Sequence, residues 1–264
     1  MPIYLAIFLG LLQGITEFLP VSSSGHLILA QALFNMPESM LMFNIILHLA
    51  TLLAVVIVFR KIIWELVTKP FCKTNLCLLL ATAITVTIVL VFHDLIDRSF
   101  NSAILPVTFM VTAVVLFATS LVSGGKKKES DEEGQRDINS DESLVTPGVA
   151  GLAGFAQGIA VIPGLSRSGF TISACLLGGA DRTNAARFSF LMSIPIIVAS
   201  FVFELVRSDG ALQIDVIPTL IAFVVALVSG ILAIKFMLEI VKRIKLYWFS
   251  LYLVVLAVVT VFVL

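Results

Sequence analysis

The chain has 264 residues, of which 59% are hydrophobic and 13% are charged, and its mean hydropathy is +1.09. This composition excludes an ordinary soluble domain and indicates an all-α protein that is embedded in a membrane. The 17 basic and 17 acidic side chains give a net charge of zero, so the charge balance does not indicate a nucleic-acid partner, and we expect none.

The first apolar segment, residues 1–35, is interrupted by a polar stretch at 13–26. Ionisable side chains are costly at membrane depth, so we expect a functional site there. Gln13 and Glu17 are four residues apart and would share one face of a helix. Pro20 would end that helix, because proline lacks a backbone donor and disfavours a helix at the residue before it.

Three serines, Ser22, Ser23 and Ser24, follow the proline and are suited to cap a new helix, which we expect to run through Leu27–Leu33. The free N–H groups and the positive dipole at a helix N-terminus bind phosphate. A serine cluster after a proline is also compatible with a cap that has no ligand, and a single histidine such as His26 with an interfacial side chain.

Six later windows contain no charged residue and approach the ~20 apolar residues that a spanning helix needs. They lie at 40–59, 74–92, 104–122, 188–203, 216–234 and 246–264. The 188–203 window is short, and we expect it to extend through its flanks by snorkelling. Within the first window, His48 and Asn44 share a helix face, where an interhelical hydrogen bond is the favoured interpretation.

The apolar segment at 148–180 is also interrupted, by a stretch at 157–169 that repeats the first. At a constant offset of 144 residues, identical pairs are Gly10 and Gly154, Gln13 and Gln157, Gly14 and Gly158, Ile15 and Ile159, Ser22 and Ser166, Ser24 and Ser168, and Gly25 and Gly169. Each half then has one broken segment and three spans. Three is odd, so the second half would be inverted, and inverted repeats with broken helices place a binding site near the bilayer midplane.

The predicted halves are repeat one at 1–122 and repeat two at 148–264, joined by a polar linker at 123–147. The linker has four basic and seven acidic residues and is expected to be a flexible connector. The halves also diverge at the site: Glu17, Ser23 and His26 correspond to Val161, Arg167 and Phe170. The first half would supply acid–base groups, and the second a fixed cation suited to phosphate, although arginine alone could snorkel.

Basic residues favour cytoplasmic loops, and their distribution predicts the orientation. Only Arg98 and Arg207 fall on one side of the predicted bundle, and Arg167 lies inside the second polar stretch. The other side holds 14 of the 17 basic residues: Arg60, Lys61, Lys69, Lys73, Lys126, Lys127, Lys128, Arg136, Arg182, Arg187, Lys235, Lys242, Arg243 and Lys245. That side, with the linker, would be cytoplasmic, and both termini would lie outside.

At these residues the chain resembles the undecaprenyl-pyrophosphate phosphatase family, also called the bacitracin-resistance family. The family motifs are (Glu/Gln)-x-x-x-Glu, here Gln13 to Glu17; Pro-Val-Ser-Ser-x-Gly-His, here Pro20 to His26; and Pro-Gly-x-Ser-Arg-Ser-Gly, here Pro163 to Gly169. The Phe-Ser-Phe-Leu run at Phe188 to Leu191 also fits. The resemblance therefore covers essentially the whole chain.

The resemblance implies a multi-pass enzyme of the bacterial plasma (inner) membrane, with a site open to the outer face. It would hydrolyse undecaprenyl pyrophosphate to undecaprenyl phosphate and inorganic phosphate. This reaction recycles the lipid carrier of peptidoglycan synthesis, supports cell shape and confers bacitracin resistance. A divalent cation, Mg²⁺ or Ca²⁺, is the implied cofactor. The sequence leaves the oligomeric state open, a homodimer included.

Carried over by position, Glu17, Ser23, His26 and Arg167 are the implied catalytic residues, and Glu17 is the implied metal ligand. Gln13 replaces a family glutamate and can be only a neutral ligand or positioning group. The expected substrate-binding residues are Gln13, Ser22, Ser24, Gly25, Ser166, Ser168 and Gly169. Ser23, His26 or a water molecule could each be the nucleophile.

Two other functions fit the sequence. Inverted repeats with broken helices are common in transporters, so a polyprenyl-phosphate flippase or an anion transporter is the main alternative. The one-sided placement of Glu17 and His26 favours an enzyme instead. A structural scaffold would leave the costly polar residues at repeat-related positions without a purpose.

Overall fold

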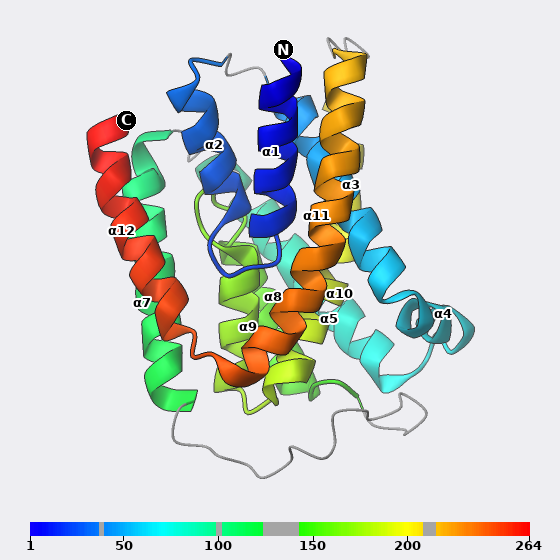
Figure 1. Ribbon diagram of the computed structural model, residues 1–264. Coiled ribbons are helices and arrows are strands. Elements are labelled where there is room, and N and C mark those ends of the chain that lie inside the picture. Colours follow the sequence, from blue (N-terminus) through cyan, green and yellow to red (C-terminus); the bar gives the residue numbers. More distant parts are fainter. Residues whose placement is uncertain (37–39, 99–101, 124–142, 208–214) are drawn as a thin grey trace.

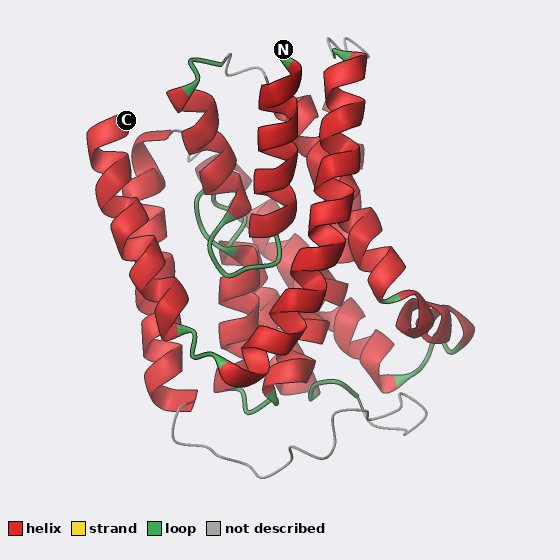
Figure 2. Ribbon diagram, viewed as in Figure 1, coloured by secondary structure: helices red, strands yellow, loops and turns green. Residues whose placement is uncertain are grey.

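A computed structural model gives the fold and describes residues 1–36, 40–98, 102–123, 143–207 and 215–264 (Figure 1). All regular structure in these ranges is helical, as Figure 2 shows. The elements are α1 (Ile3–Thr16), α2 (Ser23–Leu33), α3 (Leu41–Val58), α4 (Arg60–Thr68), α5 (Lys73–Val91), α6 (His93–Arg98), the 3₁₀ turn η1 (Ser102–Ile104), α7 (Leu105–Ser123), α8 (Pro147–Ile159), α9 (Arg167–Leu177), α10 (Arg182–Arg207), α11 (Val216–Arg243) and α12 (Tyr247–Val263).

Four described helices, α5, α7, α10 and α11, are long and apolar enough to cross a membrane. The chain is therefore a multi-pass membrane protein. α3 passes the same test only together with α4, which is bent away from it by 78°, and α12 is a shorter apolar helix. The predicted short window at 188–203 lies inside α10, which has 26 residues, so its flanks are themselves helical.

Most outward-facing side chains of these helices are apolar. On α11, Leu220, Val224 and Leu232 are 61%, 50% and 62% exposed. Apolar surface of this kind along whole helices suits hydrocarbon rather than water.

The two interrupted segments fold as helical hairpins, α1 with α2 and α8 with α9. In Figure 1, α1 and α2 enter from the end of the bundle that carries both chain termini, and α8 and α9 enter from the opposite end. The two turns, drawn as green loops in Figure 2, meet about halfway through the molecule. This arrangement places the two polar stretches in one region, at the depth where each hairpin reverses.

Each hairpin packs against a long helix from the other half of the chain, because glycines allow close approach. α1 lies along α11, where a Cβ on Gly14 would stand 2.6 Å from the carbonyl oxygen of Ala226. α8 lies along α5, where a Cβ on Gly154 would stand 2.5 Å from the carbonyl oxygen of Ala81. Small residues at such contacts are the usual means of tight packing between membrane helices.

The remaining helices complete the bundle. α7 pairs with α12, and α3 contacts α10. α4, the end of α11 and the starts of α5 and α10, which together carry most of the described basic residues, lie toward the end of the bundle opposite the termini (Figure 1). Lys126, Lys127, Lys128 and Arg136, and the side chains of Arg98 and Arg207, lie outside the described residues.

Candidate active site

The carboxylate of Glu17 is the centre of the polar region where the hairpins meet. Glu17 follows the last turn of α1 and is 5% exposed. Its Oε2 accepts a hydrogen bond from Nε2 of Gln13 at 2.8 Å, as the four-residue spacing predicts, and one from Oγ of Ser23 at 2.5 Å. Buried carboxylates need such donors, so the amide and the hydroxyl hold Glu17 in one orientation.

The guanidinium of Arg167 comes from the other hairpin and pairs with Oε1 of the same carboxylate. Arg167 is the first residue of α9, and its side chain is 20% exposed. Glu17 and Arg167 are therefore in direct contact, as the two related stretches suggested.

Two polar atoms beside this pair lack a partner within the described part of the chain. Nη1 of Arg167 is buried and donates no hydrogen bond, and Oε1 of Gln13 is buried and accepts none. Buried polar groups are nearly always satisfied, so these two atoms are available to a ligand or to a water molecule. One is a donor suited to an anion, and the other is an acceptor suited to a cation.

Two helix N-termini open onto the same region, and both are capped by serines as predicted. Ser22 Oγ accepts from the backbone N–H of Gly25 at 3.2 Å, and Ser166 Oγ accepts from that of Gly169 at 3.1 Å. Ser22 has φ 68°, a conformation that costs a non-glycine residue about 1–3 kcal/mol. The positive ends of α2 and α9 therefore face the site.

Other predicted site residues join the two hairpins directly. Ser168 Oγ donates to the carbonyl of Leu19 at 2.9 Å, and the N–H of Gly164 donates to Oγ of Ser24 at 3.4 Å. Gly164 has φ +85°, and a Cβ there would also press against Thr108 of α7. The glycine is therefore required both by its backbone and by the lack of space.

His26 and Ser23 form hydrogen bonds with different partners. Its Nδ1 is 2.7 Å from the carbonyl of Ser22, and its Nε2 is 2.6 Å from the hydroxyl of Tyr252 on α12. Ser23 instead donates to Glu17. The described contacts thus give the two predicted catalytic side chains different partners.

The structure brings to the site a histidine for which the sequence favoured a structural interpretation. His48 on α3 places Nε2 3.6 Å from Oε2 of Glu17 and binds the carbonyl of Asn44 through Nδ1 at 2.8 Å. Asn44 makes the predicted interhelical bond, accepting from Nε2 of Gln31 on α2 at 2.7 Å. Of His48 and Asn44, His48 is the residue whose side chain faces Glu17. The four-residue spacing in the sequence predicts that His48 lies near Asn44, but it gives no indication that His48 lies near Glu17.

α7 contributes the wall of the site on one side. Thr112 Oγ1 accepts from the backbone N–H of Ser166 at 3.2 Å, and the ring of Phe109 lies edge-on to that of His26, 6.0 Å between centroids. Neither residue stands out in an apolar helix sequence.

Comparison with known proteins identifies the family of this chain. A family model described as "Bacitracin resistance protein BacA" matches residues 6–259. The chain belongs to this family.

Curated relatives cover almost the whole chain. The undecaprenyl-diphosphatase of Carboxydothermus hydrogenoformans is 40% identical over 258 residues, spanning 96% of this chain and 94% of the relative. The undecaprenyl-diphosphatases of Treponema denticola and Christiangramia forsetii are 38% and 35% identical, each again over 96% of this chain and 94% of the relative.

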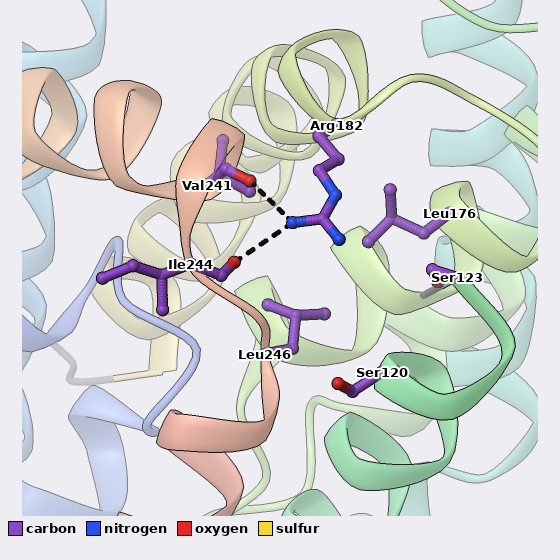
Figure 3. A pocket seen from close by; sticks show the side chains of 7 residues that line it. All are labelled: Ser120, Ser123, Leu176, Arg182, Val241, Ile244 and Leu246. Carbon is purple, nitrogen blue, oxygen red and sulfur yellow. Dashed lines mark hydrogen bonds between the residues drawn. The ribbon is translucent and has the colours of Figure 1, made fainter. Parts of the chain in front are cut away.

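A small cavity lies away from the motifs that carry the family resemblance. It has a volume of about 10 Å³, room for one water molecule, and is lined by Ser120, Ser123, Leu176, Arg182, Val241, Ile244 and Leu246 (Figure 3). In it, Arg182 donates to the carbonyls of Val241 and Ile244 at 3.3 and 3.2 Å. A cation on the last carbonyls of α11 stabilises that helix end, so this arginine has a structural use.

Proposed function

We propose that the protein is an undecaprenyl-diphosphatase, which hydrolyses undecaprenyl pyrophosphate to undecaprenyl phosphate and inorganic phosphate. The observation that carries the proposal is the pairing of Glu17 and Arg167 across the tips of two hairpins. Family membership supports the same activity. Bacitracin resistance and a role in cell-wall synthesis follow from the removal of this lipid.

Pyrophosphate binding would rest on fixed positive charge. Nη1 of Arg167 has no hydrogen-bond partner among the residues that the structure describes, and the N-termini of α2 and α9 add their dipoles. Phosphoryl transfer depends mainly on positioning and on charge stabilisation, so donors that are already in place are what the reaction needs. The substrate-binding residues we propose are Gln13, Ser22, Ser24, Gly25, Ser166, Ser168 and Gly169.

We assign the attack on phosphorus to Ser23. Its Oγ is held by Glu17, which can take the hydroxyl proton as the Ser23–phosphorus bond forms and the bond to the lipid phosphate breaks. Water then releases phosphate from the serine. His26 lies one turn further along α2, where its bond with Tyr252 allows it to take up or release a proton.

A divalent cation fits the residues at the site. Glu17 and Oε1 of Gln13 would hold it, since carboxylate and amide oxygens are the ligands that Mg²⁺ and Ca²⁺ prefer. No described group of three or more His, Cys, Asp or Glu side chains is arranged for a metal, so phosphate oxygens would complete its shell. When bound, the ion would neutralise phosphate charge.

The prenyl tail would remain in the lipid. An open apolar groove of about 430 Å³ runs along the outer face of α7, and it is lined by Pro106, Val107, Met110, Val111, Val114 and Val115. The inner face of the same helix contacts the site through Thr112 and Phe109. A tail in this groove need not be extracted, which would cost about 0.8 kcal/mol per CH₂.

We further propose six spans in an inverted repeat, with repeat one at 1–122, linker 123–147 and repeat two at 148–264. The helix contacts support the inverted repeat. α1 of repeat one lies along α11 of repeat two, and α8 of repeat two lies along α5 of repeat one, as a twofold relation between the halves requires. The distribution of basic residues favours a cytoplasmic linker, both termini outside and a site open to the outer face. We also propose a homodimer, which a measurement of the molar mass of the protein in detergent would test.

The test is phosphate release by the purified protein from undecaprenyl pyrophosphate in detergent with Mg²⁺ or Ca²⁺. Glu17→Ala and Arg167→Ala should abolish release, whereas Arg60→Ala on the exposed face of α4 should not. Normal turnover by both site variants would disprove the assignment. Movement of labelled lipid across vesicles without hydrolysis would favour a flippase or anion transporter instead.

A further inference from the structure

The imidazole of His48 faces the carboxylate of Glu17 at 3.6 Å, an arrangement that either a proton on Nε2 or a cation bound between the two groups would stabilise. Nδ1 of His48 lies 2.8 Å from the carbonyl of Asn44, and a carbonyl can only accept, so Nδ1 carries a proton. In the neutral ring Nε2 then has a lone pair. That lone pair lies 3.6 Å from Oε2 of Glu17, which is also an acceptor.

The spacing of these two atoms suits a shared metal ion. Ligands about 2.0–2.2 Å from one metal lie roughly 2.8–3.8 Å from each other at the usual coordination angles. A third acceptor, Oε1 of Gln13, is buried in the same region and has no partner among the described residues. Gln13 is fixed there, because its Nε2 donates to Glu17.

We propose that His48 is a ligand of the divalent cation, together with Glu17 and Gln13. The inference rests on the proposed function for the presence of a cation, and it adds a nitrogen ligand from α3. Imidazole binds Co²⁺ and Zn²⁺ better than Mg²⁺ and Ca²⁺, which prefer oxygen. The site of this chain should therefore rank Co²⁺ and Zn²⁺ above the two hard cations.

The hydrogen bond from Nδ1 to Asn44 supports this role. Metal-binding histidines usually donate their second ring nitrogen to a carbonyl or carboxylate, which fixes the tautomer and aims the other nitrogen at the metal. His48 has this partner, whereas both ring nitrogens of His26 are already engaged by Ser22 and Tyr252.

The test uses Mn²⁺ alone on the full-length protein in detergent, without substrate. Pulsed electron paramagnetic resonance should detect ¹⁴N coupling from a directly bound imidazole. The coupling should change to that of ¹⁵N in wild-type protein labelled with ¹⁵N-histidine, which needs no variant to fold. It should vanish in His48→Gln and persist in His26→Gln and in His93→Gln, whose ring packs against Phe203 on α10.

A second measurement is cation affinity. His48→Gln keeps an oxygen in place of the nitrogen, so Co²⁺ affinity should fall by about tenfold or more while Mg²⁺ affinity changes little. Coupling that survives in His48→Gln, or bound Mn²⁺ without nitrogen coupling in the wild type, would overturn the inference. Phosphate release is measured in parallel: release without nitrogen coupling defeats only the His48 ligand, and coupling without release defeats only the proposed function.

Discussion

The hydroxyl of Tyr252 lies 2.6 Å from Nε2 of His26, although 226 residues separate them, and the two rings are parallel within 4°. Nδ1 of the same ring bonds to the carbonyl of Ser22, so in the neutral ring Nε2 accepts from the tyrosine. α12 thus supplies a hydrogen-bond partner to a side chain on α2.

Tyr252→Phe should therefore lower kcat by about tenfold with little change in KM, because it removes one proton-transfer partner of His26 and leaves the phosphate donors intact. The matched control is Tyr247→Phe on the same helix, whose ring packs against Phe117 and Trp248. Steady-state phosphate release on both variants tests the expectation. Equal kcat for the two would show that the tyrosine hydroxyl has no part in turnover.

The neighbouring serines should behave differently. Ser23→Ala removes the hydroxyl that Glu17 holds, and we expect kcat to fall by at least about 100-fold. Ser24→Ala removes a proposed substrate-binding hydroxyl that contacts Oγ of Ser22 and the N–H of Gly164, so its effect should fall mainly on KM, with kcat within a few-fold of the wild type. Near-normal turnover by Ser23→Ala would instead indicate that water attacks directly.

The Glu17–Arg167 pair should show strong energetic coupling. Glu17→Gln or Arg167→Gln alone leaves one buried charge unpaired, which typically costs about 3–5 kcal/mol of stability. The double variant removes both charges, so its loss should be clearly smaller than the sum of the two single losses. Unfolding of the four proteins in metal-free detergent gives the cycle, and additive losses would contradict a direct ion pair.

Two glycines on α8 provide a test of the packing. Gly154→Ala would place a Cβ 2.5 Å from the carbonyl oxygen of Ala81, and we expect a loss of about 1–3 kcal/mol or more. Gly151→Ala meets only Cδ1 of Ile84 at 3.6 Å, an ordinary contact. That change should leave stability equal or raise it by up to about 1 kcal/mol through helix propensity. Similar unfolding midpoints for both variants would contradict close contact of α8 with α5.

Local sequence rules predicted the parts of the site that depend on neighbouring residues. The serine caps at Ser22 and Ser166 and the bond between Gln13 and Glu17 each span four residues or fewer, so a pattern can reveal them. The repeated motif also predicted the contact between Glu17 and Arg167, because two related stretches suggest one shared site.

Contacts made across the bundle could not be predicted in this way. His48 and Tyr252 reach the site only through the packing of α3 and α12, and one polar ring in an apolar span has no periodic signal. The 78° bend between α3 and α4 was also missed. The apolar window ends at Phe59 whether the chain continues straight or bends there, and the direction of α4 depends on its contacts with the rest of the protein.

The contact of α1 with α11 has a consequence for how the protein is made. α1 ends at Thr16, and α11 begins at Val216. At about 5–20 residues per second, a ribosome needs on the order of 10–40 s to produce the intervening chain. During that interval the glycine face of α1 has no native partner, so the newborn amino-terminal hairpin must be sheltered by lipid or by the insertion machinery until the late helix arrives.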